Sequence, residues 1–179
     1  MRFIQMPLPG AWVIELERVG EDDRGWFART FDVEEFHARG MDPAVVQCNL
    51  SVNPQRDTLR GMHYQAEPHG ESKLVRCVRG AIYDVALDLR PDSATYCQWH
   101  GVELSSANRL AYYIPAGLAH GFQTYSDNCE VLYQMGHHYV PEAARGVRFD
   151  DPAFGIKWPQ PAGERIISDG DRSYPDFSP

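Results

Sequence analysis

Short runs of strand-forming residues, separated by closely spaced turn signals, limit the folds open to this chain more than any other feature. Branched, aromatic and aliphatic residues recur in segments such as AVVQCNLSVN (44–53), TLRGMHYQ (58–65) and EVLYQ (130–134). Turn-forming residues lie between them, as in NPQRD (53–57). Many short strands with turns at this spacing indicate an all-β sandwich or barrel.

A single segment near the N-terminus has the pattern of a helix. Asp32 is a suitable N-cap, Glu35 follows three residues later as in a capping box, and Gly40 suits the C-terminal end. Residues 11–19 and 26–31, on either side of a turn, are expected to form strands ahead of it. The sequence therefore predicts an all-β fold with one or two short helices.

Residues 73–88 predict two strands joined by a tight turn at Arg79–Gly80. With a two-residue turn, Val78 would pair with Ala81, and Lys73 would lie diagonally from Asp84, within reach of an ion pair. The face that carries both charges is otherwise apolar, so it would be the inner one. The pair is then either a buried structural pair or part of a site.

Size and charge exclude several classes of function. The chain has 179 residues, 43% of them hydrophobic and 23% charged, which is the balance of one ordinary globular domain over residues 1–179. Its formal net charge of -8 and its lack of a basic block argue against binding to nucleic acid or to anionic membranes.

The N-terminal and cysteine patterns bear on the compartment. The N-terminal residues lack the continuous apolar segment of a signal peptide, and no run is long enough to span a bilayer. The four cysteines are widely spread, which favours reduced, buried thiols. A cytoplasmic location is therefore expected.

The first candidate for chemistry is the pair Arg60 and His63. Strict strand alternation would put them on opposite faces, but Gly61 lies between them, and a glycine inside a strand often marks a bulge. A lone strand histidine is more often a hydrogen-bonded or surface residue than a catalyst. Cationic neighbours, including Lys73, favour instead an anion site that contains a base.

The second candidate is His120 in YYIPAGLAHGF (112–122). The spacing Pro115-x-Gly117-x-x-His120 is the turn-then-strand signature of cupin barrels. A metal-binding cupin would also carry an H-x-H pair and a glutamate on an earlier strand. The sequence has no H-x-H, and a metal needs three or four convergent ligands. The pattern thus predicts a cupin shape without a metal.

Two further residues are ambiguous from pattern alone. Tyr133 lies in a predicted strand, where packing is the ordinary role of a tyrosine. Asp171 lies in a polar C-terminal stretch, where an aspartate is usually a solvated turn residue.

A set of motifs in order along the chain resembles one family. They are DRGWF (23–27), QCNLS (47–51), TLRGMHYQ (58–65), KLVRCVRGAIYDVALDLR (73–90), IPAGLAHGF (114–122), EVLYQ (130–134), DDPAFGIKWP (150–159) and SDGDRSYP (168–175). Together they resemble the dTDP-4-dehydrorhamnose 3,5-epimerase family over nearly the whole chain. The resemblance implies a metal-independent cupin-type β jelly roll that needs no cofactor. It also implies a homodimer to which the N-terminal strands contribute, acting on nucleotide-linked 4-keto-6-deoxyhexoses in dTDP-rhamnose and polysaccharide biosynthesis.

The resemblance also implies roles for residues. His63 would be the base that removes a proton beside the C4 ketone, and Asp171 would hold its imidazole. Tyr133 would return a proton from the opposite face. Lys73, supported by Asp84, would stabilise the enolate oxygen. The substrate-binding residues would be Arg60 and Arg24 at the diphosphate, Gln47, Asn49 and His120 along the site, and Tyr139 stacked on the base.

Departures from the family pattern leave alternatives open. Arg29 and Ala144 stand where glutamates are usual, Gly170 where lysine is usual, and Asp57 where glycine is usual. The nucleotide could therefore be GDP or CDP, and the enzyme could act at C3 or C5 only or be a ketoisomerase. A non-catalytic nucleotide-sugar binding cupin and a metal-dependent dioxygenase are the alternatives outside the isomerases.

Overall fold

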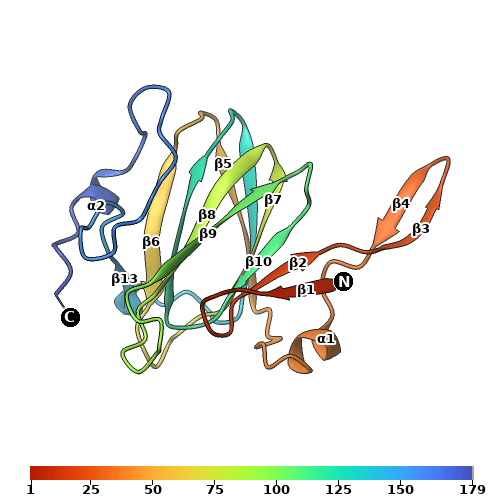
Figure 1. Cartoon of the computed structure of the whole chain (residues 1–179), viewed down its shortest axis with the longest axis horizontal. Coiled ribbons are helices and arrows are strands. Elements are labelled where there is room, and N and C mark those ends of the chain that lie inside the picture. The colour runs from red at the N-terminus through yellow and green to blue at the C-terminus, as the bar shows by residue number, and fades with distance from the viewer. Residues whose placement is uncertain (179) are drawn as a thin grey trace.

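Two antiparallel β-sheets packed face to face form the body of the protein (Figure 1). The computed structural model describes residues 1–178. One sheet has six strands in the order β1 (Arg2–Gln5), β2 (Trp12–Glu15), β10 (Ala111–Ile114), β7 (Lys73–Arg79), β12 (Cys129–Met135) and β5 (Gln47–Asn53). The other has five, in the order β13 (Ala144–Gly146), β6 (Leu59–Gln65), β11 (Leu118–Thr124), β8 (Ala81–Asp88) and β9 (Trp99–Ser105). The predicted all-β jelly roll is confirmed.

Three apolar clusters hold these layers together. The central one fills the space between the sheets and includes Val75 and Tyr112 from one sheet and Ile82 and Phe122 from the other. A second lies on the outer side of the five-stranded sheet, where the C-terminal segment covers it with residues such as Trp158. A third lies between the six-stranded sheet and α1. The C-terminal segment is thus packed onto the barrel wall by its own apolar side chains.

The helices are few and short, as predicted. Helix α1 spans Val33–His37, and the Asp32 side chain accepts hydrogen bonds from the backbone N–H groups of Glu34 and Glu35. A second helix, α2 (Asp169–Arg172), and the 3-10 helix η1 (Pro141–Ala143) complete the set within residues 1–178. The N-cap therefore satisfies two of the N–H groups that a helix start leaves unpaired.

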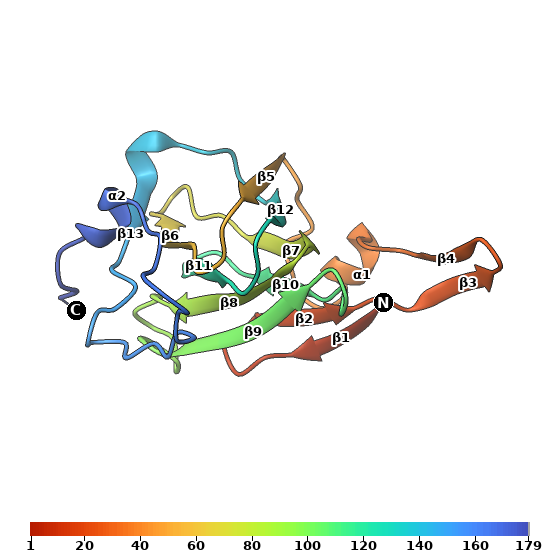
Figure 2. The same cartoon turned by 90° about the horizontal axis from the view of Figure 1, so that it is seen from above.

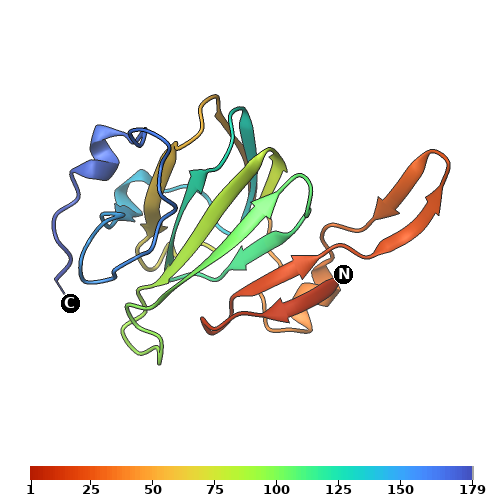
Figure 3. The ribbon, with the colours of Figure 1, turned by 45° about the horizontal axis from the view of Figure 1, so that its top comes forward.

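The N-terminal strands divide differently from the prediction. The expected strand over residues 11–19 is two strands, β2 and β3 (Arg18–Asp22), and β4 (Gly25–Ala28) ends before Phe31. β3 and β4 pair only with each other. Their hairpin extends away from the sheets, as seen from two further directions (Figures 2 and 3).

The predicted hairpin of residues 73–88 is wrong. β7 and β8 follow each other in sequence but belong to opposite sheets, because the chain turns at Gly80, with a φ of 78°, and passes from the six-stranded to the five-stranded sheet. Val75 and Cys77 still face the same core as Ile82 and Ala86, from the other side. A period-two apolar pattern reports which face is buried and does not report which sheet the strand joins.

The break in alternation at Gly61 is confirmed. β6 pairs with β11 so that His63 lies opposite His120 and Arg60 opposite Phe122, which leaves one extra residue on β6. Leu59 and Met62 are fully buried in the outer cluster, while Arg60 and His63 point to the other side. The bulge therefore turns Arg60 and His63 onto one face.

The bulge needs glycine on both strands. Gly61 has a φ of 123°, and a Cβ there would lie 2.5 Å from Gly121 Cα. A Cβ on Gly121 would lie 2.8 Å from the Arg60 carbonyl oxygen. Only two residues without side chains allow the strands to approach this closely.

We predict that Gly61→Ala destabilises the protein by about 2–4 kcal/mol, because it combines a backbone clash with a strained φ. Gly163→Ala is the control, since a Cβ at Gly163 meets nothing within 4 Å. Urea unfolding of both variants measures the difference. Equal stabilities would contradict the role assigned to the glycine pair.

Candidate active site

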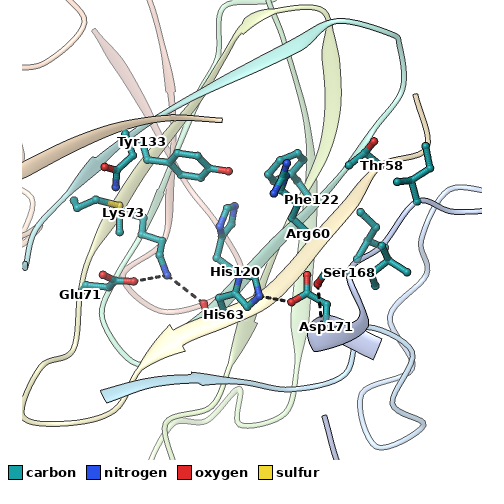
Figure 4. A pocket seen from close by; sticks show the side chains of 15 residues that line it. Thr58, Arg60, His63, Glu71, Lys73, His120, Phe122, Tyr133, Ser168 and Asp171 are labelled. Atoms are coloured by element: carbon teal, nitrogen blue, oxygen red, sulfur yellow. Dashed lines mark hydrogen bonds and ion pairs between the residues drawn. The ribbon is translucent and has the colours of Figure 1, made fainter. Parts of the chain in front are cut away.

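A cavity of about 600 Å³ opens between the two sheets. Side chains from both sheets and from the segment around α2 line it (Figure 4). The predicted site residues that line it are Asn49, Arg60, His63, Lys73, His120, Tyr133 and Asp171. The structure therefore gathers into one space residues from five strands and the C-terminal segment.

His63 and Asp171 form a pair at the mouth of this cavity. His63 Nε2 lies 2.7 Å from Asp171 Oδ1, and the Gly61 backbone N–H donates to Asp171 Oδ2 over 3.1 Å. Burial alone would raise the pKa of Asp171, but the bonds from His63 and Gly61 hold this pKa below its ordinary value. An ionised carboxylate only accepts, so Nε2 carries the proton and Nδ1 is the basic nitrogen.

The local sequence explains how Asp171 reaches this position. Ser168 caps α2, its side chain accepting from the Asp171 N–H, and Asp171 is the buried residue of that helix. Upstream, the Asp57 carboxylate accepts from Ala162 N over 2.9 Å. Asp57 has a φ of 59°, a conformation that aspartate tolerates. This non-glycine residue thus also ties the C-terminal segment to the barrel.

Tyr133 lies on the opposite wall from His63, on β12 of the six-stranded sheet. Its ring packs edge-on against His120, with 5.8 Å between ring centroids. Burial raises the pKa of the Tyr133 phenol far above its ordinary value, and the nearby Asp84 carboxylate raises it further, although Arg60 opposes this. The hydroxyl therefore keeps its proton at neutral pH.

Lys73 does not pair with Asp84, and that prediction is wrong. Its ammonium lies 2.9 Å from Glu71 Oε1 and donates to the His63 carbonyl oxygen over 3.1 Å. Lys73 and Glu71 are both buried. The expected diagonal pair fails because β7 and β8 lie in different sheets.

Asp84 instead pairs with His120. The two are on adjacent strands of the five-stranded sheet, and His120 Nε2 lies 2.7 Å from Asp84 Oδ1. Asp84 is completely buried and His120 nearly so. The site therefore has two histidine–carboxylate pairs: both members of the first line the cavity, and of the second only His120 does.

A second, smaller cavity adjoins the first. It has a volume of about 330 Å³, and Asn49, Glu71 and Met135 line both. Gln47 and Tyr139 line only the smaller one, and Gln47 Oε1 accepts from the Tyr139 N–H over 2.6 Å. Tyr139 is exposed. Two of the predicted substrate-binding residues thus lie beside the main cavity rather than inside it.

Arg60 and Arg24 have different surroundings. Arg60 is held at the cavity by its Nε, which donates to Asn53 Oδ1 over 2.8 Å. Arg24 lies in the turn of the β3–β4 hairpin, with 90% of its side chain exposed and an ion pair to Asp22. The structure does not bring Arg24 to the cavity of its own chain.

Glu71 is the functional candidate that the sequence did not reveal. It lies two residues before Lys73, a spacing that places both on one side of an extended chain. That spacing was the available signal, but the mistaken pairing of Lys73 with Asp84 left Glu71 without a role. Phe122 and Met135 supply apolar wall to the cavity and have no distinctive sequence signal.

Residues 1–178 contain no group of three or more His, Cys, Asp or Glu side chains that could hold a metal ion. The described helices include none long and apolar enough to cross a membrane. The four cysteines are free thiols, but only Cys77 and Cys129 are buried, so the expectation of burial is wrong for Cys48, which is exposed, and holds only partly for Cys97.

Comparison with known families gives one consistent result. The family model described as dTDP-4-dehydrorhamnose 3,5-epimerase matches residues 5–179. An enzyme of that name from Methanothermobacter thermautotrophicus is 47% identical over 175 residues, which cover 97% of this chain and 92% of the relative. A dTDP-4-dehydrorhamnose 3-epimerase from Streptomyces niveus is 38% identical, over 96% of this chain and 82% of the relative.

Solved structures agree with these matches. The crystal structure of dTDP-4-dehydrorhamnose 3,5-epimerase from Elizabethkingia anophelis superposes with a TM-score of 0.95 at 35% identity, covering 99% of this chain and 96% of that one. ChmJ, a 3'-monoepimerase from Streptomyces bikiniensis solved with dTDP-quinovose, gives a TM-score of 0.87 at 34% identity, covering 96% and 85%. The likeness therefore extends over nearly the whole chain in both sequence and structure.

The lowered pKa of Asp171 predicts a pH dependence of stability. A carboxylate with a depressed pKa in the folded state stabilises the fold above its unfolded pKa of about 4, and this stabilisation is lost as the pH falls through the folded value. Asp171→Asn should therefore lower the free energy of unfolding at neutral pH. The difference in free energy of unfolding between this variant and the unaltered protein should shrink as the pH falls below about 4.

Urea unfolding across this pH range measures the effect. Asp169→Asn is the matched control, because Asp169 is exposed on the same short helix. A constant difference between the Asp171 variant and the unaltered protein at every pH would contradict the assigned ionisation.

Proposed function

The chain belongs to the dTDP-4-dehydrorhamnose 3,5-epimerase family, and from this premise we propose that it inverts C3 and C5 of dTDP-4-dehydro-6-deoxyglucose by proton transfer through an enolate. An isomerase of this family acts on a dTDP-sugar. The observation that carries the proposal is that a histidine–aspartate pair and a protonated tyrosine lie on opposite walls of one cavity. Inversion requires an acid and a base on opposite faces of the same carbon.

His63 acts as the base. The C4 ketone makes the protons on the neighbouring carbons C3 and C5 acidic, and an imidazole nitrogen without a proton can accept one of them. Asp171 accepts from Nε2, so that Nδ1 is the nitrogen that takes the proton. The aspartate also stabilises the imidazolium that forms. No metal or organic cofactor enters this step.

Tyr133 acts as the acid. Its raised pKa keeps the phenol protonated until the adjacent carbanion, a much stronger base, is present. Its proton reaches the carbon from the wall opposite His63, which gives the opposite configuration. A shuttle that used only His63 would return the proton to the same face and would not invert the centre.

Two positioned groups beside the catalytic walls stabilise the enolate. Lys73 and His120 both line the cavity, and each is held by a carboxylate, Glu71 and Asp84 respectively. These fixed groups favour negative charge on the C4 oxygen without having to reorganise. Arg60 binds the diphosphate, and the smaller cavity, with Gln47 and Tyr139, receives the nucleotide base.

Inversion at C3 alone is the second candidate function. Two of the similar proteins described above act as a 3-epimerase or 3'-monoepimerase. A base–acid pair of this kind serves one or both carbons, depending on whether the sugar can present each of them. Exchange with solvent distinguishes the two.

We further propose that the protein functions as a homodimer. The β3–β4 hairpin extends into solvent with Val19 and Phe27 exposed by 71% and 67%, and β5 exposes Leu50 and Val52 by 55% and 54%. These apolar surfaces favour association with a second copy. The exposed Arg24 would then reach the cavity of the partner chain and complete its diphosphate site.

Proton NMR of dTDP-4-dehydro-6-deoxyglucose in D2O is the first test. We predict loss of both the C3 and C5 proton signals with the unaltered enzyme. His63→Ala should slow exchange by about 10²–10⁴-fold. Circular dichroism should show an unchanged fold. Tyr133→Phe should retain more exchange than inversion, because only reprotonation from the far wall is lost.

Full activity of the His63 variant would rule out the assigned base. Exchange at C3 only would establish the second candidate function. Equal loss of exchange and inversion in the Tyr133 variant would contradict its role as the acid.

Subunit complementation tests the dimer. Arg24→Ala and His63→Ala proteins are each expected to be weakly active or inactive. After mixing, unfolding and refolding, mixed dimers should regain activity. In each mixed dimer, the cavity of the Arg24 variant retains His63 and receives Arg24 from its partner. Failure to regain activity, with mixed dimers shown to form, would contradict the exchange of hairpins.

A further inference from the structure

Two buried polar atoms within residues 1–178 have no hydrogen-bond partner: Asp84 Oδ2 and the Tyr112 hydroxyl. Both residues are completely buried. A buried polar atom without a partner costs free energy, and a charged one costs more. Two such atoms in the same core therefore call for a common explanation.

Strand register places the two groups on facing walls. Tyr112 and Tyr133 both pair with Val75, from the two sides of β7, so the three residues form one row and point to the same side. Tyr112 and Val75 belong to the central cluster between the sheets. On the other side of the core, in the five-stranded sheet, Asp84 of β8 pairs with Phe122 of β11. Phe122 belongs to the same central cluster.

The charge on Asp84 acts on both tyrosines. Burial, and then the Asp84 carboxylate, raise the pKa of the Tyr112 phenol far above its ordinary value, as they do for Tyr133. The Tyr112 hydroxyl therefore keeps its proton and can donate it in a hydrogen bond. Asp84 bonds to His120 on β11, and its charge acts on Tyr112 on β10 and Tyr133 on β12. The charged groups that line the adjoining cavity are Arg60 on β6 and Lys73 on β7, and Tyr83, next to Asp84 on β8, packs against the outer cluster.

We propose that Tyr112 is a positioning residue for the reaction: its hydroxyl donates to Asp84 Oδ2 through one water molecule, and so fixes the carboxylate that holds His120. This inference rests on the proposed function, in which His120 stabilises the enolate. It assigns Tyr112 no contact with substrate. The unpartnered donor and the unpartnered acceptor then satisfy each other.

Such a link has consequences for His120. With Oδ1 bonded to His120 and Oδ2 linked to Tyr112, both carboxylate oxygens of Asp84 accept hydrogen bonds and its orientation is fixed. The His120 ring is then held with its Nε2–H toward Asp84. Without the tyrosine hydroxyl, the carboxylate charge is less stabilised and attracts the His120 proton more strongly. The imidazolium form of His120 then persists to higher pH.

Tyr112→Phe tests the proposal, because it removes one oxygen and preserves the ring. We expect kcat to fall about tenfold, as for loss of a hydrogen bond to a charged group, with KM within about twofold. We also expect the NMR titration of the His120 imidazole, measured in the free protein, to move to higher pH. In Asp84→Asn protein, adding Tyr112→Phe should change neither quantity further.

Tyr113→Phe is the matched control. Tyr113 is the next residue on β10 and belongs to the third cluster, between the six-stranded sheet and α1, and its hydroxyl accepts from the Asp42 N–H over 2.8 Å. Tyr113→Phe likewise removes a tyrosine hydroxyl that takes part in a hydrogen bond. It should reduce stability and leave the His120 titration unchanged.

The outcomes separate the two proposals. The inference would be overturned if Tyr112→Phe left the His120 titration unchanged and were at least as stable as the unaltered protein. Removing a buried hydroxyl that has no partner is expected to raise stability, because its desolvation cost is lost. A shifted titration in a protein without epimerase activity would support the link and refute the proposed function. Should the variant not fold, the unaltered protein decides: a slowly exchanging Tyr112 hydroxyl proton supports the link, and its absence overturns it.

Discussion

The close approach of β6 and β11 at two glycines is the constraint on which the site depends. Without it, Arg60 and His63 would alternate to opposite faces, and only one of them could reach the cavity. The same bulge directs the Gly61 N–H toward Asp171. One local irregularity thus positions the proposed base, a phosphate-binding candidate and a donor to the aspartate that orients the base.

The electrostatics of the cavity follow a single pattern. Each basic group near the expected position of the substrate ketone has its own carboxylate: Asp171 for His63, Glu71 for Lys73, and Asp84 for His120. Buried charges are tolerated when they are paired, so the carboxylates make it possible to keep Lys73 inside an apolar barrel and to hold the two imidazoles in place. In a chain with a net charge of -8, Arg60, held through its Nε by the neutral Asn53 side chain, brings positive charge to the cavity where an anionic substrate would need it.

The sequence predicted what depends on local pattern and failed where the partner strand decides. The helix cap at Asp32, the bulge at Gly61 and the inner faces of the strands could all be read from neighbouring residues. The sheet to which β8 belongs could not, because Arg79–Gly80 suits a hairpin and a crossing between sheets equally well. From that one error followed the wrong partner for Lys73 and the omission of Glu71. The exposed position of Arg24 was equally hidden, since no local pattern shows how far a hairpin extends from the body.

The position of Asp171 outside both sheets has a consequence for local unfolding. The strands of both sheets are complete by Gly146, whereas the carboxylate that orients His63 lies in α2, on the segment that covers the outer cluster. Local opening of that segment would separate Asp171 from His63 while the strands of both sheets stayed paired. Loss and recovery of the oriented base would then follow the opening of this one segment rather than the unfolding of the whole barrel.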